Sequence, residues 1–318
     1  MSRLRPPGPL ALQAPSQIQV HTDPPHSAFL AGGIAACGAV TLTHPFETVK
    51  IRMQLQGELR SSLSRSQLLY KGPFHGIAQI ARLESPLALF RGLTCAYAYQ
   101  LLLNGCRLGF YEPLRRMGNT LVFGGGSEGL QSAGVNVACG AGSGMLGAAA
   151  GSPFFLVKTR LQSFSAALPV GTQHEYRSAR DGFGRIWAQE GVVGLYRGVG
   201  AAMVRTGFGS AVQLPTYFFA KRRLLKIEGV EEGLPLHLAS SAASGLVVCC
   251  VMHPPDTIMS RMYNQTGNLY RGVFDCLWKT VRTEGPLAIY KGFNAHLARI
   301  LPHTVGGCSS RCVLWAKG

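Results

Sequence analysis

One short pattern occurs three times in the chain, at residues 45–54, 153–162 and 254–263. Each copy begins with a proline, and these prolines stand 108 (153 − 45) and 101 (254 − 153) residues apart. A solenoid unit typically has roughly 20–50 residues, so a repeat of this length is not a solenoid. Three homologous thirds instead predict a ring of three units with a functional axis between them.

A second signature follows each copy of the pattern. It consists of an acidic residue (Glu84, Glu190 and Glu284) and then an aromatic–basic–glycine triplet at residues 90–92, 196–198 and 290–292. Two signatures in a fixed order make accidental similarity between the thirds improbable.

The composition limits the class of protein. Of the 318 residues, 47% are hydrophobic and only 14% are charged, 40 are glycines, and the net charge is +16. A basic balance fits nucleic acid, anionic lipid or an anionic substrate. A nucleic-acid-binding protein would interleave basic and aromatic residues on a soluble face, whereas here the basic residues lie at helix ends and in loops. We therefore expect no nucleic-acid partner.

The chain has no convincing pattern for an enzyme, a metal site or a cofactor site. Residues 142–147 fit GxGxxG, but no strand precedes them and they lie inside an apolar helical stretch. The nine cysteines lack the paired spacing of zinc sites or disulfide frameworks. His44 and His253 stand at matching places beside repeat prolines, where they are better explained as hydrogen-bonding residues at helix ends than as metal ligands. We expect no enzymatic activity, no metal and no cofactor.

Three stretches lack charged residues, at 24–46, 129–157 and 233–255. Each exceeds the roughly 20 residues that cross a bilayer, and each ends near a repeat proline, where a helix should kink. The partner segments, at 92–117, 198–225 and 292–318, are apolar but contain arginine. The sequence therefore predicts an all-α membrane protein with six transmembrane helices, two per repeat, around a central cavity. Glycines spaced four apart, such as Gly140/Gly144 and Gly147/Gly151, should let helices approach closely.

The expected organisation has five parts. Residues 1–26 form a disordered extension, 27–118, 130–226 and 234–304 form the three repeats, and 305–318 form an atypical tail. The tail is rich in glycine and polar residues where an apolar helix should continue, so we expect it to truncate the sixth helix. Lysine and arginine gather in the long loop of each repeat, which predicts that these loops face the inner compartment and that both termini lie opposite.

The threefold pattern of proline, acid and base, followed by acid–glycine and aromatic–basic–glycine, closely resembles the mitochondrial carrier family over residues 27–304. The resemblance implies a multi-pass antiporter of the mitochondrial inner membrane. Its central site would open alternately to either side under the control of two networks of ion pairs.

On the matrix side the resemblance implies a ring of three ion pairs, each between the acid of one repeat and the base of another. Two pairs can be drawn, Glu47 with Lys158 and Asp256 with Lys50. The third pair of positions holds Phe155 and Met259, which are both uncharged and which we expect to meet. Losing both partners leaves no unpaired charge, and a Met–Phe contact is favourable.

Other parts of both gates follow from the same resemblance. Gln54 and Gln162 match the glutamine that braces the matrix gate, and Tyr263 replaces the third. The outer gate is expected to contain Tyr111, Glu112, Arg115, Tyr217 and Lys221, with Glu112 pairing with Lys221. The helix starts after Arg91–Gly92, Arg197–Gly198 and Lys291–Gly292 are expected to bind cardiolipin, and we expect a monomer.

The substrate site can be placed by counting eight residues from each basic residue of the aromatic–basic–glycine triplet. The count reaches Tyr99, Arg205 and Arg299, which three symmetric helices would hold at one depth, roughly 12 Å along each helix. Arginines inside a membrane imply a water-filled cavity, and a guanidinium binds carboxylate or sulfate through two bonds. No acid lies near these arginines on their own helices. Neutral hydrogen bonds are expected from Tyr99, Gln100, Asn104 and Thr206.

Two equivalent arginines predict a dianion, and a tyrosine in the third position argues against tricarboxylates. The segment 99–115 resembles the branch of fungal oxaloacetate carriers most, which implies transport of oxaloacetate, malonate, sulfate or similar dianions. Two alternatives remain open. One is a carrier of another dicarboxylate or oxo-acid, and the other is a transport-inactive truncated carrier.

Overall fold

The computed structural model describes residues 25–59, 68–123, 133–225, 234–265, 267 and 269–299. Every regular element in these ranges is helical. The expected extension at residues 1–24 and the expected tail at 305–318 lie outside them, as do residues 300–304.

Three long helices carry the repeated proline pattern. They are α1 (Pro25–Leu55), α4 (Ala133–Ser163) and α7 (Leu234–Asn264), of 31 residues each. The helices continue past the repeat prolines, which lie inside them. Helix α1 begins two residues before the expected start of the first repeat.

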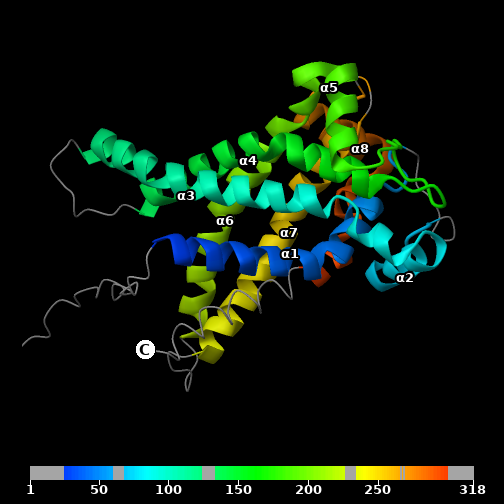
Figure 1. Cartoon of the computed structure of the whole chain (residues 1–318). Coiled ribbons are helices and arrows are strands. Elements are labelled where there is room, and N and C mark those ends of the chain that lie inside the picture. Colours follow the sequence, from blue (N-terminus) through cyan, green and yellow to red (C-terminus); the bar gives the residue numbers. More distant parts are fainter. Residues whose placement is uncertain are drawn as a thin grey trace, which may run out of the picture.

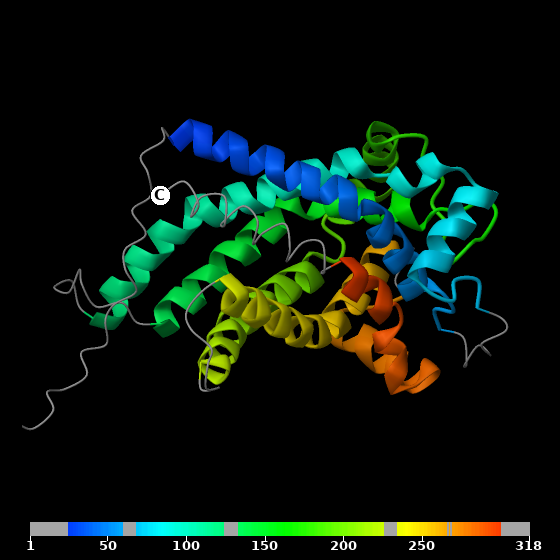
Figure 2. The same ribbon diagram turned by 90° about the horizontal axis from the view of Figure 1, so that it is seen from below.

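The second helices of the repeats follow the aromatic–basic–glycine triplets. These are α3 (Leu93–Phe123), α6 (Val199–Leu224) and, in the third repeat, a helical segment at residues 293–299. In both views α3 lies beside α4, and α6 lies beside α7 (Figures 1 and 2). Across the ranges given above, no helix meets the combined length and hydropathy expected of a membrane span.

Short helices fill the long loop of each repeat. They are α2 (Pro73–Leu83) with η2 (Pro86–Phe90), α5 (Ala179–Leu195), and α8 (Val273–Glu284) with η3 (Pro286–Tyr290). All of them gather at one end of the long helices (Figures 1 and 2). The sequence analysis did not foresee them, although their apolar residues recur at helical spacing. In α2, for example, the side chain of Ile80 is buried, whereas its neighbours Gln79 and Ala81 are only half-buried.

The glycine of each triplet joins one repeat to another. Gly92, Gly198 and Gly292 have φ angles of +80°, +85° and +83°, which glycine adopts at little cost. A Cβ on Gly92 would lie 3.2 Å from the carbonyl oxygen of Lys158, and one on Gly292 would lie 3.3 Å from that of Lys50. These close approaches hold the start of each second helix against a first helix of another repeat.

Helices α3 and α4 also approach closely through glycine. A Cβ on Gly147 would come within 2.8 Å of the Leu103 carbonyl oxygen, and one on Gly151 within 2.7 Å of the Tyr99 ring. The small residues of α4 therefore allow the contact expected of them at these two positions, whereas Gly140 has open space beside it.

Candidate functional site

The two expected ion pairs of the matrix gate are present in the structure. Lys158 Nζ lies 2.8 Å from Glu47 Oε2, and Lys50 Nζ pairs with Asp256 Oδ2. Each pair joins α1 to the first helix of another repeat, α4 or α7. All four side chains are largely buried, with at most 12% of a side chain exposed. The first helices of the three repeats are therefore held together by buried ion pairs at this level.

Each gate carboxylate also binds one of the two arginines predicted to hold substrate. Arg205 Nε of α6 lies 2.6 Å from Asp256 Oδ1, and Arg299 Nη1 lies 3.2 Å from Glu47 Oε1. The sequence analysis found no acid for these arginines because it considered only their own helices. The acids come from neighbouring repeats, which only the tertiary arrangement brings together.

These two contacts have different places in the ring of repeats. Arg299–Glu47 joins the third repeat to the first, where Lys50–Asp256 already forms an ion pair. Arg205–Asp256 joins the second repeat to the third, where the gate positions hold Phe155 and Met259. Arg205 thus supplies an ion pair at the interface whose gate pair is missing.

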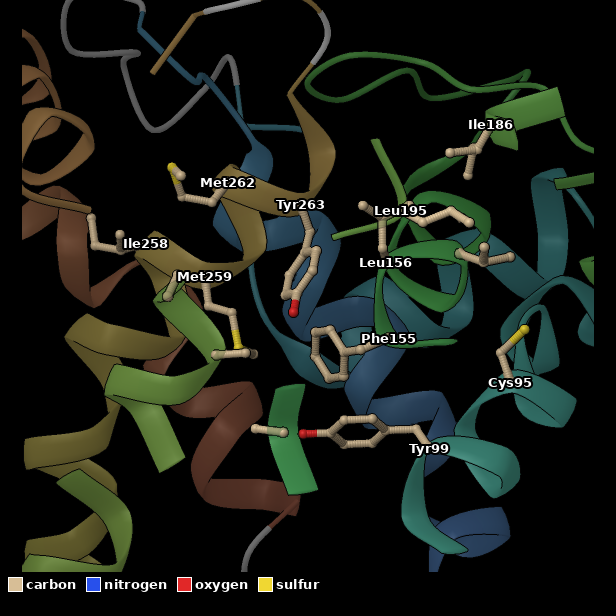
Figure 3. Packing of buried hydrophobic residues seen from close by; sticks show 14 of the residues in the cluster. Cys95, Tyr99, Phe155, Leu156, Ile186, Leu195, Ile258, Met259, Met262 and Tyr263 are labelled. Carbon is tan, nitrogen blue, oxygen red and sulfur yellow. The ribbon is translucent and has the colours of Figure 1, made fainter. Parts of the chain in front are cut away.

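Aromatic rings fill the space at that interface. The Phe155 ring centroid lies 4.9 Å from that of Tyr99 and 5.2 Å from that of Tyr263. Met259 belongs to the same buried cluster (Figure 3). The ring contacts of Phe155 are therefore with tyrosines of α3 and α7, which the sequence analysis did not predict. Tyr99 is only 7% exposed and packs inside this cluster.

The bracing residues make hydrogen bonds between repeats. Gln54 of α1 donates to the Thr257 hydroxyl (3.2 Å) and accepts from the Ser260 hydroxyl (2.8 Å), both on α7. Gln162 of α4 donates to the Thr48 hydroxyl of α1 at 3.1 Å. The Tyr263 hydroxyl lies 2.8 Å from that of Ser152, so a tyrosine makes the third link.

The remaining candidate substrate residues lie on the second helices. Gln100 and Asn104 are half-buried on α3. The Thr206 hydroxyl donates to the Ala202 carbonyl oxygen of its own helix at 2.8 Å. Its oxygen can therefore accept a hydrogen bond from a substrate, but its proton is already used.

A second set of buried ion pairs lies below the gate, and the sequence analysis missed it. Arg52, Arg160 and Arg261 of the three first helices are fully buried and pair with Glu84, Glu190 and Glu284 respectively. Burial alone would raise the pKa of the Glu284 carboxyl, but the hydrogen bonds and charge of Arg261, together with hydrogen bonds from Lys291 and the Leu59 amide, hold the pKa below its ordinary value. The three arginines occupy equivalent positions in the repeats, and so do the three glutamates. This recurrence in the sequence could have predicted the ion pairs.

The same arginines also bind backbone oxygens of another repeat. Arg52 Nε donates to the Gln162 carbonyl (2.9 Å), Arg160 Nε to the Tyr263 carbonyl (3.3 Å), and Arg261 Nη2 to the Gln54 carbonyl (3.4 Å). The three bonds form a ring around the axis. They close the matrix end beneath the ion pairs of the gate.

The outer-gate candidates Glu112 and Lys221 lie on α3 and α6. Glu112 forms ion pairs with Arg115 (3.0 Å) and Arg116 (3.4 Å) of its own helix. A pair between Glu112 and Lys221 stays a prediction. Tyr111 is half-buried on α3, and the side chain of Tyr217 lies outside the described residues.

The basic residues of the triplets make contacts at the matrix end. The Arg91 guanidinium lies 5.3 Å from the centroid of the Phe164 ring. Arg197 lies 3.3 Å from Glu190, and Lys291 pairs with Glu284. Two of the three basic side chains therefore share the glutamate that binds the buried arginine.

Comparison with known proteins decides the family. The sequence model of the family described as "Mitochondrial carrier protein" matches residues 21–120, 130–228 and 231–309. The chain belongs to the mitochondrial carrier family. The carrier is therefore a transport protein of the mitochondrial inner membrane and not an enzyme, as predicted.

Several relatives of the carrier are known. "Mitochondrial citrate transporter E" of Aspergillus niger is 69% identical over 87% of this chain and 89% of the relative. The proteins named "Mitochondrial oxaloacetate transport protein" from Schizosaccharomyces pombe and Saccharomyces cerevisiae are 53% and 52% identical. The first of these alignments covers 93% of the carrier and 92% of the relative, and the second covers 87% and 85%.

Proposed function

We propose that the carrier moves small dianions such as oxaloacetate, malonate and sulfate across the inner membrane by alternating access. The observation that supports this most is that Arg205 and Arg299 each bind a carboxylate of another repeat. A substrate with two anionic groups can take the places of Asp256 and Glu47 on these arginines. A guanidinium suits both carboxylate and sulfate because its N–H groups match two oxygens at once.

The same geometry links binding to opening. Arg205–Asp256 is the ion pair between the second and third repeats at the level of the gate, where Phe155 and Met259 replace a charged pair. When a dianion draws Arg205 away from Asp256, this interface keeps its aromatic contacts but loses its ionic one. Substrate binding therefore loosens the gate at the interface where it has fewest charges.

Citrate is a second candidate substrate, because the relative from A. niger with 69% identity is named a citrate transporter. A tyrosine at position 99 leaves two arginines for three carboxylates. We therefore expect dianions to compete better than citrate for the site. Exchange of external citrate, sulfate, malonate and oxaloacetate against internal oxaloacetate ranks these candidates directly.

The site assignment is tested in liposomes that contain the purified carrier. Arg205→Ala and Arg299→Ala should each lower dianion exchange at least roughly tenfold, because a hydrogen bond to a charged group contributes roughly 1.5–3 kcal/mol. Arg205→Lys should also be slow, since an ammonium cannot make the forked contact. Arg185→Ala, at an exposed pair on α5, is the matched control.

Two outcomes would contradict the proposal. Normal exchange by either arginine variant would remove these residues from the substrate site. Absence of exchange of every dianion by the unmodified carrier, with intact folding, would favour the transport-inactive alternative.

A further inference from the structure

A strap of chain, residues 165–174 of the second repeat, lies against both other repeats at the matrix end. It follows α4 and precedes α5, and it has no part in the mechanism above. Two hydrogen bonds fold the strap back on itself. The Ser165 amide donates to Gln173 Oε1 (2.9 Å), and Gln173 Nε2 donates to the Val170 carbonyl oxygen (2.6 Å). The strap therefore has a defined conformation of its own.

Apolar contacts attach the strap to the first repeat. Val170 is 4% exposed and belongs to a buried cluster with Leu55 of α1, and Leu168 packs against the same cluster. The Ser165 hydroxyl also donates to Glu84 Oε1 at 2.7 Å. Exposing buried apolar side chains to water loses the whole free energy of their burial, so this attachment is costly to break.

Hydrogen bonds attach the strap to the third repeat at Asn264, the last residue of α7. Asn264 Nδ2 donates to the Thr172 carbonyl oxygen (3.1 Å), and His174 Nε2 donates to the Asn264 carbonyl oxygen (3.0 Å). Water can replace the partners when such bonds break at the matrix surface, so the net contribution of each bond to stability is small. This attachment is therefore easier to break than the one to the first repeat.

The strap fills the space between the matrix ends of α1 and α7. A Cβ on Gly171 would lie 3.2 Å from Leu55 Cβ and 2.9 Å from Asn264 Nδ2. Alternating access requires the first helices to separate at this end, where buried ion pairs hold them together in the structure. When α1 and α7 move apart, the strap cannot keep both contacts.

We infer that the strap helps to close the matrix end, and that it stays on the first repeat and releases Asn264 when this end opens. The inference rests on the proposed function, since only a carrier that alternates needs the release. The contacts of Leu168 and Val170 are then kept throughout the cycle. Asn264, in contrast, becomes accessible to water each time the carrier opens to the matrix.

Two engineered disulfides test which contact breaks. Gly171→Cys is combined with Leu55→Cys or with Asn264→Cys, because position 171 is close to both partners and a disulfide needs Cβ atoms roughly 3.5–4.5 Å apart. The full carrier in liposomes is oxidised with copper phenanthroline, and sulfate–sulfate exchange is measured before and after reduction with dithiothreitol. Oxidation should abolish exchange by Gly171→Cys/Asn264→Cys, reduction should restore it, and Gly171→Cys/Leu55→Cys should stay active in both states.

The unmodified carrier and Gly171→Cys alone, under the same oxidant, control for the native cysteines, and mass spectrometry of peptides verifies each disulfide. Exchange by the oxidised Gly171→Cys/Asn264→Cys carrier would overturn the inference, because the strap would then not leave Asn264. Loss of exchange by the oxidised Gly171→Cys/Leu55→Cys carrier would also overturn it, because the strap would then have to leave the first repeat.

Labelling of single cysteines tests the inference without a change at Gly171, whose φ of +59° strains any other residue. Asn264 and Leu55 are both 0% exposed. During sulfate–sulfate exchange, N-ethylmaleimide should label Asn264→Cys faster than it does without sulfate, whereas Leu55→Cys should stay protected. Equal labelling of the two, or no acceleration at Asn264→Cys, would overturn the inference. Absence of sulfate, malonate and oxaloacetate exchange by the unmodified carrier would instead overturn the proposed function.

Discussion

At the scale of single residues, Phe155 shows how an uncharged side chain can take a place in an ionic ring. Its ring packs against Tyr99 and Tyr263, and the three come from α4, α3 and α7. Lys158 Nζ also lies 5.3 Å from the Phe155 centroid. The second and third repeats are therefore joined by aromatic burial together with the Arg205–Asp256 pair.

Removing this ring should destabilise the closed state. We expect Phe155→Ala to lower the free energy of unfolding by roughly 3–5 kcal/mol, because the substitution leaves a cavity among buried rings. Thermal unfolding in detergent measures the effect. Phe208→Ala, at a position that is 53% exposed, is the control. Equal melting temperatures for the two variants would show that Phe155 does not hold this interface.

At the scale of elements, the arginine–glutamate pairs fix each short matrix helix to the first helix of its own repeat. Arg261 and Glu284 are 0% and 1% exposed, and the Leu59 amide also donates to Glu284 Oε1 at 2.8 Å. Loop and helix are thus joined through one carboxylate. We therefore expect each first helix and its matrix helix to move as a single unit during transport.

Neutralising this carboxylate should be costly. Glu284→Gln leaves the buried Arg261 charge without its partner, which typically costs roughly 3–5 kcal/mol. Asp275→Asn removes the partner of Lys279 at an exposed pair of α8 and should have no measurable effect. The melting temperatures of both variants in detergent check this. A Glu284→Gln variant as stable as Asp275→Asn would show that the pair is not needed.

The loop between α4 and α5 crosses the matrix end of the ring. Gly171, with φ +59°, leaves no room for a Cβ between Asn264 Nδ2 (2.9 Å), Leu55 Cβ (3.2 Å) and a Glu58 oxygen (3.3 Å), and these belong to the first and third repeats. His174 Nε2 donates to the Asn264 carbonyl oxygen at 3.0 Å. All three repeats therefore meet at this loop.

His174 should make stability depend on pH. Burial, together with the nearby Arg160 charge, lowers the pKa of its imidazole from 6.5 to about 4. Above pH 6.5 neither the folded nor the unfolded form binds this proton, whereas between about pH 6.5 and 4 the unfolded chain binds it first. Stability should therefore fall with pH in this window, by up to about 3 kcal/mol.

Melting temperatures between pH 7 and 5 measure the effect. His174→Gln keeps a donor for Asn264 but cannot titrate, so its melting temperature should fall less with pH than that of the unmodified carrier. His75→Gln, at an exposed position, should behave like the unmodified carrier. A His174→Gln profile that parallels the unmodified one would assign the pH dependence to other groups.

At the scale of the whole molecule, the second helix of each repeat starts in the same way, directly after a glycine with a positive φ angle. Gly92, Gly198 and Gly292 turn the chain so that the first N–H groups of the following helices have no partner within the helix. Such helix starts favour anions such as phosphate. We propose that cardiolipin binds there, and that the carrier works as a monomer because one ring of three repeats forms the whole site.

Lipid binding should raise the melting temperature of the detergent-solubilised carrier. Cardiolipin should stabilise it more than phosphatidylcholine, because only cardiolipin brings phosphates with uncompensated negative charge. An equal shift with both lipids, or no shift with either, would argue against anion binding at the helix starts.

The sequence by itself determined the family, the threefold helical plan and the residues at equivalent points of the repeats. It could do so because a repeated pattern records which positions are equivalent, whatever their surroundings. Arg205 and Arg299 were found by counting from the repeated signatures, and the gate residues were found through the resemblance to the family. The matrix helices and the buried Arg261–Glu284 pair also recur at equivalent positions of the repeats, but the sequence analysis did not predict them.

Partnerships between repeats were decided by the tertiary structure. Arg205 meets Asp256, and Phe155 packs between Tyr99 and Tyr263, in contacts that span 51 (256 − 205), 56 (155 − 99) and 108 (263 − 155) residues of chain. No local propensity specifies such contacts, because they depend on how whole helices lie around the axis. Glu112, by contrast, pairs with Arg115 and Arg116 of its own helix. The position of a residue in the sequence shows which residues of the three repeats are equivalent, whereas the packing of the helices decides which charged side chains lie next to each other.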